Sequence, residues 1–130
     1  MKGRGVWGAV VSGVLVLLFA AGARAEVRAL DTQDVRALLN REGAEVFLLD
    51  VRTPGEYRRG HIPGAVLIPM NEVPARLREI PQDKKIVVVC ASGARSAAVA
   101  RFLDSRGYPW VANYTGGVFD WARAGLPLDR

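Results

Sequence analysis

The only cysteine of the chain, Cys90, comes where an apolar run ends and a stretch of small residues begins. The apolar run, residues 86–89, consists of β-branched residues, which predicts a strand buried on both faces. A loop of small residues after such a strand can turn its backbone N–H groups inward, and a helix that begins beside it adds partial positive charge. This concave arrangement favours anions and would stabilise a thiolate, which is the nucleophilic form of cysteine.

Arg95 adds a full positive charge five positions after Cys90. We therefore interpret Cys90 as a catalytic nucleophile and the next six residues as its substrate-binding loop. These six residues are Ala91, Ser92, Gly93, Ala94, Arg95 and Ser96. The alternative is that Cys90 is a small buried hydrophobic residue, since cysteine is among the residue types most often found in protein interiors. The small-residue loop and the arginine favour the reactive interpretation.

The first 25 residues have the pattern of a targeting segment. A basic start precedes an uncharged and mostly apolar stretch at 6–21, and the Ala-Arg-Ala at 23–25 matches a signal-peptidase site. We expect cleavage before Glu26 and a periplasmic location for the mature protein. The alternative is an uncleaved membrane anchor, because the uncharged stretch approaches the ~20 residues that span a bilayer.

The charge balance of the chain argues against a nucleic-acid partner. The 18 basic and 13 acidic residues give a formal net charge of +5. Cleavage would remove Lys2, Arg4 and Arg24, which leaves 15 basic residues against the same 13 acidic ones. Because no basic stripe with interleaved aromatic residues is present, nucleic acid is not expected to bind.

Residues 26–130 are enough for one domain with one core. With a single cysteine no internal disulfide can form, so packing alone must stabilise this domain. No long apolar surface segment indicates an obligate partner, and we therefore expect a monomer.

Strand and helix signals alternate along the mature chain. Strands are predicted at residues 26–30, 46–51, 65–68, 86–89 and 110–114. Helices or helical turns are predicted after an N-cap at Asp31, at 54–57, within 71–80, after Arg95 and at 117–124. This alternation predicts an α/β fold with a central, mostly parallel sheet of about five strands and helices on both faces. Ligands of such sheets bind beyond the carboxyl ends of the strands, where Cys90 lies.

Three stretches of the chain resemble the rhodanese-like sulfurtransferases, and in particular their small exported bacterial members. The Asp-Val-Arg, Glu-Tyr and Gly-His-Ile-Pro-Gly-Ala segments within 50–65 resemble the first signature of the family. Residues 90–96 resemble its active-site loop, and the Gly-Gly, Trp and Gly-Leu-Pro within 116–127 resemble its C-terminal signature. The resemblance covers residues 28–128 and implies one rhodanese-like domain at 26–130.

The resemblance also implies a reaction. A small anionic sulfur donor such as thiosulfate would bind at the loop, and Cys90 would attack its outer sulfur to form a persulfide. A small thiophilic acceptor, cyanide or a thiol, would then take that sulfur and restore the cysteine. Arg95 would engage the anionic end of the donor, and Ser96 is expected to cap the following helix rather than contact the substrate. This chemistry needs no metal and no organic cofactor.

Two other functions would use the same cysteine. One is phosphatase or arsenate reductase activity, since cysteine-dependent phosphatases also surround an anion with a cysteine and an arginine, usually with five residues between them. Here four residues intervene, and no aspartate is placed to act as a general acid. A periplasmic persulfide carrier would instead hand its sulfur to a partner protein, with the same chemistry at Cys90.

The sole histidine, His61, is a candidate general base. It belongs to a predicted turn that enters the third strand, and we expect it to satisfy backbone groups instead. Asp50, Arg52 and Glu56 are expected to form a salt-bridged turn beside the loop rather than a site of their own.

The remaining conspicuous residues have structural interpretations. Trp110, Phe119 and Trp121 are expected to fill the core. Gly116 and Gly117 are expected to form a turn that needs unusual dihedral angles or passes close to the pocket.

Overall fold

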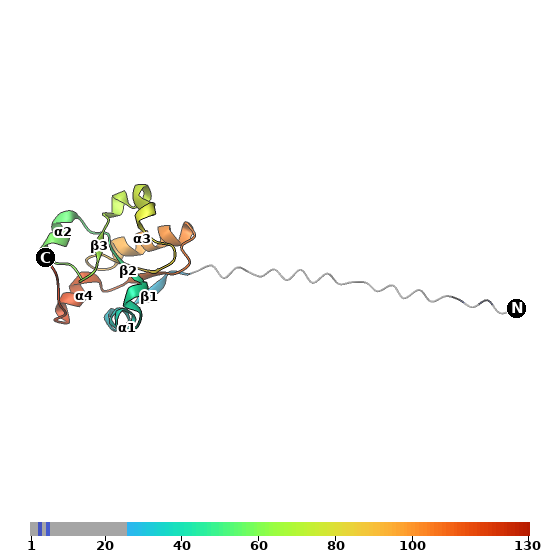
Figure 1. Ribbon diagram of the computed structural model, residues 1–130, viewed down its shortest axis with the longest axis horizontal. Helices are drawn as coiled ribbons and strands as arrows, with labels where there is room; N and C mark the ends of the chain where they lie inside the picture. The colour runs from blue at the N-terminus through green and yellow to red at the C-terminus, as the bar shows by residue number, and fades with distance from the viewer. Residues whose placement is uncertain (1–2, 4, 6–25) are drawn as a thin grey trace.

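The structure is a computed structural model that describes Gly3, Gly5 and residues 26–130 (Figure 1). Apart from those two glycines, the targeting segment predicted at 1–25 lies outside the described residues. Within the part of the chain that the structure describes, no helix is long and apolar enough to cross a membrane.

Five strands form one parallel sheet in the order β1-β5-β4-β2-β3. The strands are β1 (Arg28–Leu30), β2 (Val46–Asp50), β3 (Val66–Leu67), β4 (Lys85–Val89) and β5 (Val111–Tyr114). The β-branched strand β4 takes the middle of the sheet, and every residue after its first is buried. Since a central strand is covered on both faces, its unbroken apolar sequence fits this place. The predicted α/β fold with five strands is confirmed.

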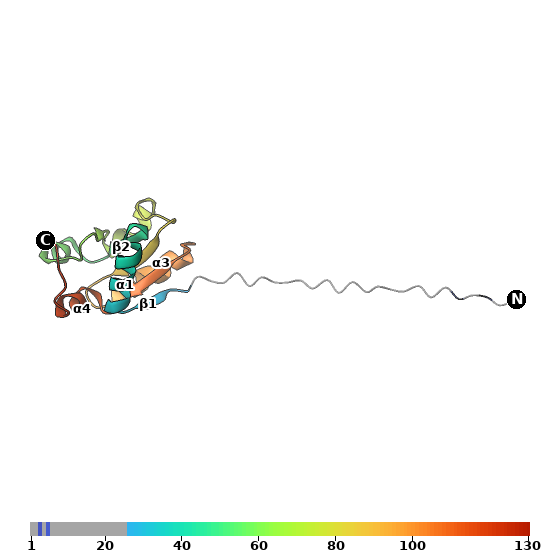
Figure 2. The same cartoon turned by 60° about the horizontal axis from the view of Figure 1, so that its bottom comes forward.

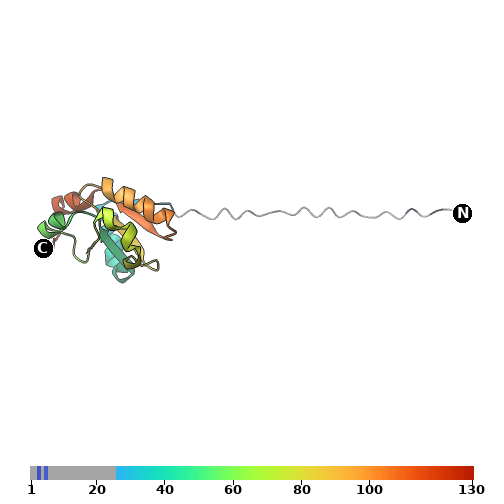
Figure 3. The same ribbon diagram turned by 90° about the horizontal axis from the view of Figure 1, so that it is seen from above.

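Helices lie on either side of the strands (Figures 2 and 3). They are α1 (Thr32–Glu42), α2 (Pro54–Arg59), α3 (Ala94–Ser105) and α4 (Gly117–Arg123), with 3-10 segments η1 (Gly43–Glu45), η2 (Met70–Glu72) and η3 (Pro74–Glu79). Alternate residues of β4 point to opposite faces of the sheet. Ile86 and Val88 pack in one apolar core with residues of α3, whereas Val87 and Val89 pack in another with residues of α1 and α4.

Two helices begin with reciprocal caps. Asp31, the predicted N-cap of α1, accepts a hydrogen bond from the Asp34 N–H, and the Asp34 carboxylate accepts one from the Asp31 N–H. At α2, Thr53 and Glu56 form the same arrangement. Such capping boxes satisfy N–H groups that the first turn leaves unpaired. The second one fixes Glu56 at the start of α2.

One of the core predictions is wrong. Trp121 is buried and Trp110 is half-buried, but Phe119 is 60% exposed. Phe119 and Trp121 are two positions apart on α4, which places them roughly 200° apart around the helix. Because Trp121 faces the core, Phe119 faces solvent.

Candidate active site

Cys90 directly follows β4, the middle strand, and therefore lies at the centre of the carboxyl edge of the sheet. The residue is 1% exposed, and the following turn leads directly into α3 at Ala94. The cysteine is a free thiol. A side chain at this position lies where parallel sheets bind their ligands.

The sulfur of Cys90 is surrounded by hydrogen-bond donors. Its Sγ lies 3.1 Å from the backbone nitrogen of Gly93 and 3.2 Å from Oγ of Ser96. The backbone N–H groups of Ser92 and Ser96 also lie close enough to the sulfur to favour its ionised form. Burial raises the pKa of the Cys90 thiol, but the hydrogen bonds from Ser96, Ser92 and Gly93 outweigh burial, so the pKa lies below its ordinary value. The loop therefore stabilises the thiolate.

The sequence led us to expect that Ser96 caps α3, and this expectation is wrong. The helix begins at Ala94, its N-cap is Gly93, and no side chain caps it. Ser96 is therefore already inside the first turn, where it is fully buried and its hydroxyl lies against the Cys90 sulfur. Its hydroxyl therefore helps to stabilise the thiolate of Cys90.

The N–H groups of the loop can face the sulfur because another helix holds the loop carbonyls. The Val118 N–H donates to the Cys90 carbonyl at 2.9 Å, and the Phe119 N–H donates to the Ala91 carbonyl at 3.1 Å. Both donors belong to the first turn of α4, which has N–H groups to spare. The peptide bonds of this loop are trans, so each carbonyl points opposite to the N–H that follows it. Anchoring the Ala91 carbonyl thus turns the Ser92 N–H toward the sulfur.

Asn113 and Gly93 complete the support of the loop. The Asn113 side-chain amide donates to the Gly93 carbonyl at 3.2 Å. Gly93 has φ +97°, and a Cβ there would lie 2.3 Å from the carbonyl oxygen of Thr115. Both the left-handed backbone and the close approach of Thr115, the residue after β5, therefore require glycine at this position.

The predicted glycine turn also lies against the loop. Gly117 has φ +60°, and a Cβ there would lie 2.5 Å from the carbonyl oxygen of Cys90. Gly116, in contrast, has an ordinary φ of −83°. The unusual dihedral expected of this turn therefore belongs to Gly117, which lets α4 approach the loop closely enough to hold its carbonyls.

Arg95 is paired with Glu56 rather than left free at the rim. Its Nη1 and Nη2 lie 2.8 and 2.9 Å from the two carboxylate oxygens of Glu56. The hydrogen bonds from Arg95 lower the pKa of Glu56 to about 2. Burial acts in the opposite direction, and hydrogen bonds from Thr53 add to the lowering. The same contact raises the pKa of Arg95. Both groups therefore stay charged at neutral pH.

Asp50 and Arg52 form the predicted salt bridge, but without Glu56. Both residues are buried, and Nη2 of Arg52 lies 2.8 Å from Oδ2 of Asp50. The same nitrogen donates to the Gly60 carbonyl at 2.8 Å. This pair joins the end of β2 to the turn after α2. The expected three-residue turn is therefore wrong for Glu56, which reaches across to Arg95 instead.

His61 makes the backbone contacts expected of it. Its Nδ1 lies 3.0 Å from the carbonyl oxygen of Tyr57, and its ring stacks on the Tyr57 ring with centroids 3.7 Å apart. Its backbone also pairs with Asp129. These contacts fix the turn before β3.

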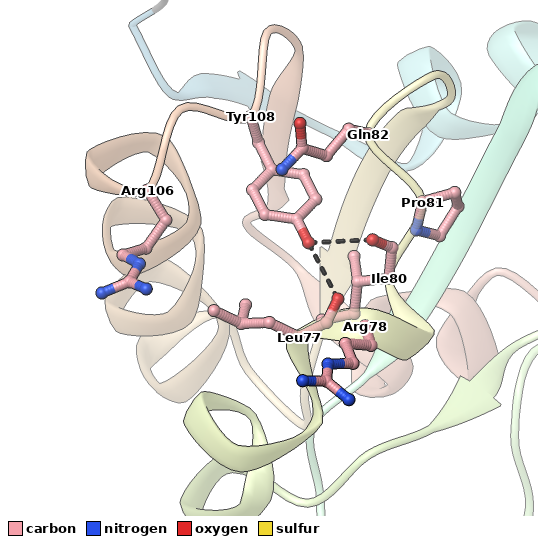
Figure 4. A pocket seen from close by; sticks show the side chains of 7 residues that line it. All are labelled: Leu77, Arg78, Ile80, Pro81, Gln82, Arg106 and Tyr108. Atoms are coloured by element: carbon pink, nitrogen blue, oxygen red, sulfur yellow. Dashed lines mark hydrogen bonds between the residues drawn. The ribbon is translucent and has the colours of Figure 1, made fainter.

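A pocket of about 380 Å³ is lined by Leu77, Arg78, Ile80, Pro81, Gln82, Arg106 and Tyr108 (Figure 4). The Tyr108 hydroxyl donates to the carbonyl oxygens of Ile80 and Leu77, at 2.8 and 3.1 Å, and these contacts attach the end of η3 to the segment that follows α3. None of its lining residues belongs to the loop. Residues 26–130 also bring together no cluster of His, Cys, Asp and Glu that could hold a metal ion.

The site can hold a thiolate and additional negative charge next to it. In the described part of the chain, the N–H groups of Ala94 and Arg95 have no hydrogen-bond acceptor. They belong to the first turn of α3, where the helix dipole favours an anion. The arrangement therefore suits nucleophilic attack that leaves a new charge beside Cys90.

Two residues of the site, Glu56 and Asn113, were not predicted from the sequence. For Glu56 a signal was present, because Thr-x-x-Glu before α2 is a capping-box pattern that fixes the glutamate in place. Asn113 offers no such signal, since one polar residue near the end of a buried strand has many structural explanations.

The comparisons with known proteins define the class of this molecule. The family model of the rhodanese-like domain matches residues 31–124, and the chain belongs to this family. A sulfurtransferase of Allochromatium vinosum is 46% identical over 84 residues, which cover 65% of this chain and 78% of that protein. The putative sulfurtransferase YtwF of Bacillus subtilis is 34% identical over 96 residues, which cover 74% of this chain and 91% of that protein.

The fold also matches a solved structure. A thiosulfate sulfurtransferase from Pseudomonas aeruginosa superposes with a TM-score of 0.70 at 30% identity. The match covers 80% of this chain but 20% of that one, so this chain corresponds to one part of a much longer protein.

Proposed function

We propose that this protein is a sulfurtransferase that moves sulfane sulfur from thiosulfate or a similar donor to cyanide or a thiol. The sulfur would travel as a persulfide on Cys90. The observation that carries this proposal is the buried Cys90 sulfur, which three backbone N–H groups and the Ser96 hydroxyl stabilise as a thiolate. The sulfurtransferases among its relatives support the same chemistry.

The first half of the reaction loads the cysteine. The Cys90 thiolate attacks the outer sulfur of thiosulfate and forms a new S–S bond. The S–S bond of the donor breaks, and its electron pair leaves with sulfite. One thiolate and one thiosulfate dianion become one persulfide anion and one sulfite dianion, so that this step needs neither a proton nor an oxidant.

The second half of the reaction removes the sulfur from Cys90. Cyanide attacks the terminal sulfur of the persulfide, the S–S bond breaks, and its electron pair returns to Cys90 as thiocyanate leaves. Between the two steps the negative charge sits one atom further from the protein backbone than in the thiolate. The unpaired N–H groups of Ala94 and Arg95 are available to stabilise it there.

Intact mass spectrometry after incubation with thiosulfate tests the proposal. We expect a gain of one sulfur atom, its loss on addition of cyanide, and no gain in Cys90→Ser. A serine hydroxyl is not ionised at neutral pH and cannot hold a persulfide. Hydrolysis of an aryl phosphate without any sulfur gain would instead support the phosphatase alternative.

A persulfide carrier is the second candidate, and one observation favours it. The side chain of Phe119 is 60% exposed although its backbone N–H holds the loop at Ala91. An exposed aromatic residue beside a reactive thiol suits a protein acceptor, because aromatic side chains often anchor protein interfaces. Saturation of the rate with cyanide or a small thiol supports the enzyme. Rapid loading by thiosulfate with no turnover by small acceptors supports the carrier.

We further propose that the protein is exported and cleaved before Glu26. The basic start, the apolar stretch and the Ala-Arg-Ala pattern of the first 25 residues support this location. The mature chain is expected in the periplasmic fraction with Glu26 as its first residue. Recovery of the full-length chain in membranes after alkaline extraction would support the anchor instead.

A further inference from the structure

Three charged groups influence one another at the mouth of the loop. Arg95 uses both terminal nitrogens of its guanidinium on Glu56, at 2.8 and 2.9 Å. The charge of Cys90 also contributes to the raised pKa of Arg95, after the larger effect of Glu56. With Cys90 as a thiolate, the rim therefore carries one positive and two negative charges. The nearby Asp50–Arg52 pair adds no net charge.

The carboxylate of Glu56 is a fixed part of this rim. Its Oε1 also accepts hydrogen bonds from the N–H and the hydroxyl of Thr53, at 3.2 and 3.1 Å. Its pKa of about 2 keeps it ionised wherever Cys90 is a thiolate, so protonation does not release Arg95. Arg58 and Arg59 belong to the same short helix, and the Arg59 guanidinium reaches back along it, with Nη1 3.8 Å from where a Cβ of Gly55 would lie. Both side chains are exposed, so solvent screens their charges.

We propose that Glu56 determines donor specificity, by favouring sulfane-sulfur donors that carry one negative charge over the thiosulfate dianion. This inference rests on the proposed function and specifies its donor class. Glu56 occupies the edge of Arg95 that would otherwise clamp two donor oxygens, and it adds a charge that repels a second negative charge on the donor. Between charges several ångströms apart at a protein surface, this effect amounts to roughly tenfold in rate.

A pair of donors that differ in one charge isolates this effect. Thiosulfate and methanethiosulfonate both present an outer sulfur on an oxidised sulfur atom, but the second has a methyl group in place of one anionic oxygen. Attack by Cys90 on methanethiosulfonate forms the same persulfide and releases methanesulfinate with the electron pair of the broken S–S bond. The measured quantity is the ratio of kcat/KM for persulfide formation from thiosulfate to that from methanethiosulfonate.

Glu56→Gln keeps the size of the side chain and one acceptor for Arg95, and it removes the charge. We expect this variant to raise the ratio by roughly tenfold. The matched control is Glu42→Gln, since Glu42 forms an ion pair with Lys85 at 2.9 Å. Lys85 begins β4 whereas Cys90 follows its end, about 16 Å along the strand. Over that distance salt screens the charge, so the control should leave the ratio as in the wild type.

The wild-type protein provides a test that needs no variant. If the rim repels a second negative charge, added salt weakens that repulsion, and the ratio rises with ionic strength. A ratio that falls with salt would mean that attraction by Arg95 dominates, and it would overturn the inference. So would a ratio in Glu56→Gln no higher than in Glu42→Gln while both donors load Cys90. Failure of both donors to load the wild type would contradict the proposed function instead.

Discussion

Replacing Ser96 by alanine would remove a single oxygen atom from the centre of the site. Ser96 is fully buried, and its Oγ lies 3.2 Å from the Cys90 sulfur. The backbone N–H of residue 96 stays in place, and alanine is a good helix former, so α3 should be preserved. The space left by one oxygen is smaller than a water molecule requires, so that no solvent donor can replace the hydroxyl.

The expected magnitude follows from what this hydroxyl contacts. A hydrogen bond to a charged group contributes about 1.5–3 kcal/mol, and this one stabilises the thiolate of Cys90 rather than the thiol. Its loss should shift the equilibrium toward the thiol by a factor of roughly ten to a hundred. The pKa of Cys90 therefore rises in Ser96→Ala. At high pH, where both proteins are ionised, the variant thiolate should react at least as fast, because a more basic thiolate is the better nucleophile.

The assay is the rate of alkylation by iodoacetamide as a function of pH, with kcat/KM for thiosulfate measured over the same range. Ser105→Ala is the matched control, since Ser105 lies at the other end of α3 and its hydroxyl donates to the Phe102 carbonyl. We expect the midpoint of the Ser105→Ala curve to match the wild type. A folded Ser96→Ala protein with an unchanged midpoint would refute the assigned hydrogen bond.

Four further changes have defined outcomes. Arg95→Ala should lower kcat/KM for thiosulfate about tenfold to a hundredfold. Adding Glu56→Gln to this variant should restore part of the loss, because it removes the carboxylate that Arg95→Ala leaves unpaired. Strictly additive effects of the two substitutions would argue against the Arg95–Glu56 pair. Gly93→Ala should lower the free energy of unfolding by at least about 1–2 kcal/mol in denaturant titrations and prevent sulfur uptake, because φ there is +97°. His61→Ala should lose about 1–3 kcal/mol of stability through the Tyr57 contacts but keep a kcat/KM close to wild type; the opposite pattern would make it catalytic. Since folding lowers the pKa of Glu56 from 4.5 to about 2, the stability advantage of the wild type over Glu56→Gln should be complete above pH 4.5 and shrink as pH falls toward 2; a gap independent of pH would contradict the shift.

The features that the sequence predicted well depend on residues close together in the chain. The β-branched run at 86–89 predicts a central strand because burial on both faces needs apolar residues at every position. Asp31 predicts a helix start because the cap involves only Asp34, three positions away. The alternation of strands and helices predicts a parallel sheet, and Cys90 directly follows the central strand, so it lies at the carboxyl edge where parallel sheets bind ligands.

The features that the sequence did not predict depend on contacts between distant segments. Glu56 and Arg95 are 39 positions apart, and several other carboxylates could have faced that guanidinium. The start of α3 is set by Gly93, whose left-handed conformation fits closely against Thr115 on the neighbouring segment. Ser96 therefore enters the first turn and not the cap. Local propensity contains no information on either contact.

The attachment of α4 to the loop couples the acidity of the Cys90 thiol to the local stability of the C-terminal segment. The amides of Val118 and Phe119 donate to the loop carbonyls. The Trp121 indole N–H donates to the Pro127 carbonyl at 2.8 Å and so attaches the C-terminal residues to α4. Proteins open locally in cooperative units, often well before the whole domain unfolds. Opening of α4 would free the loop carbonyls and let the donors turn away from the sulfur. Hydrogen exchange at the Val118 and Phe119 amides and a rise in the pKa of Cys90 should therefore both report the opening of α4.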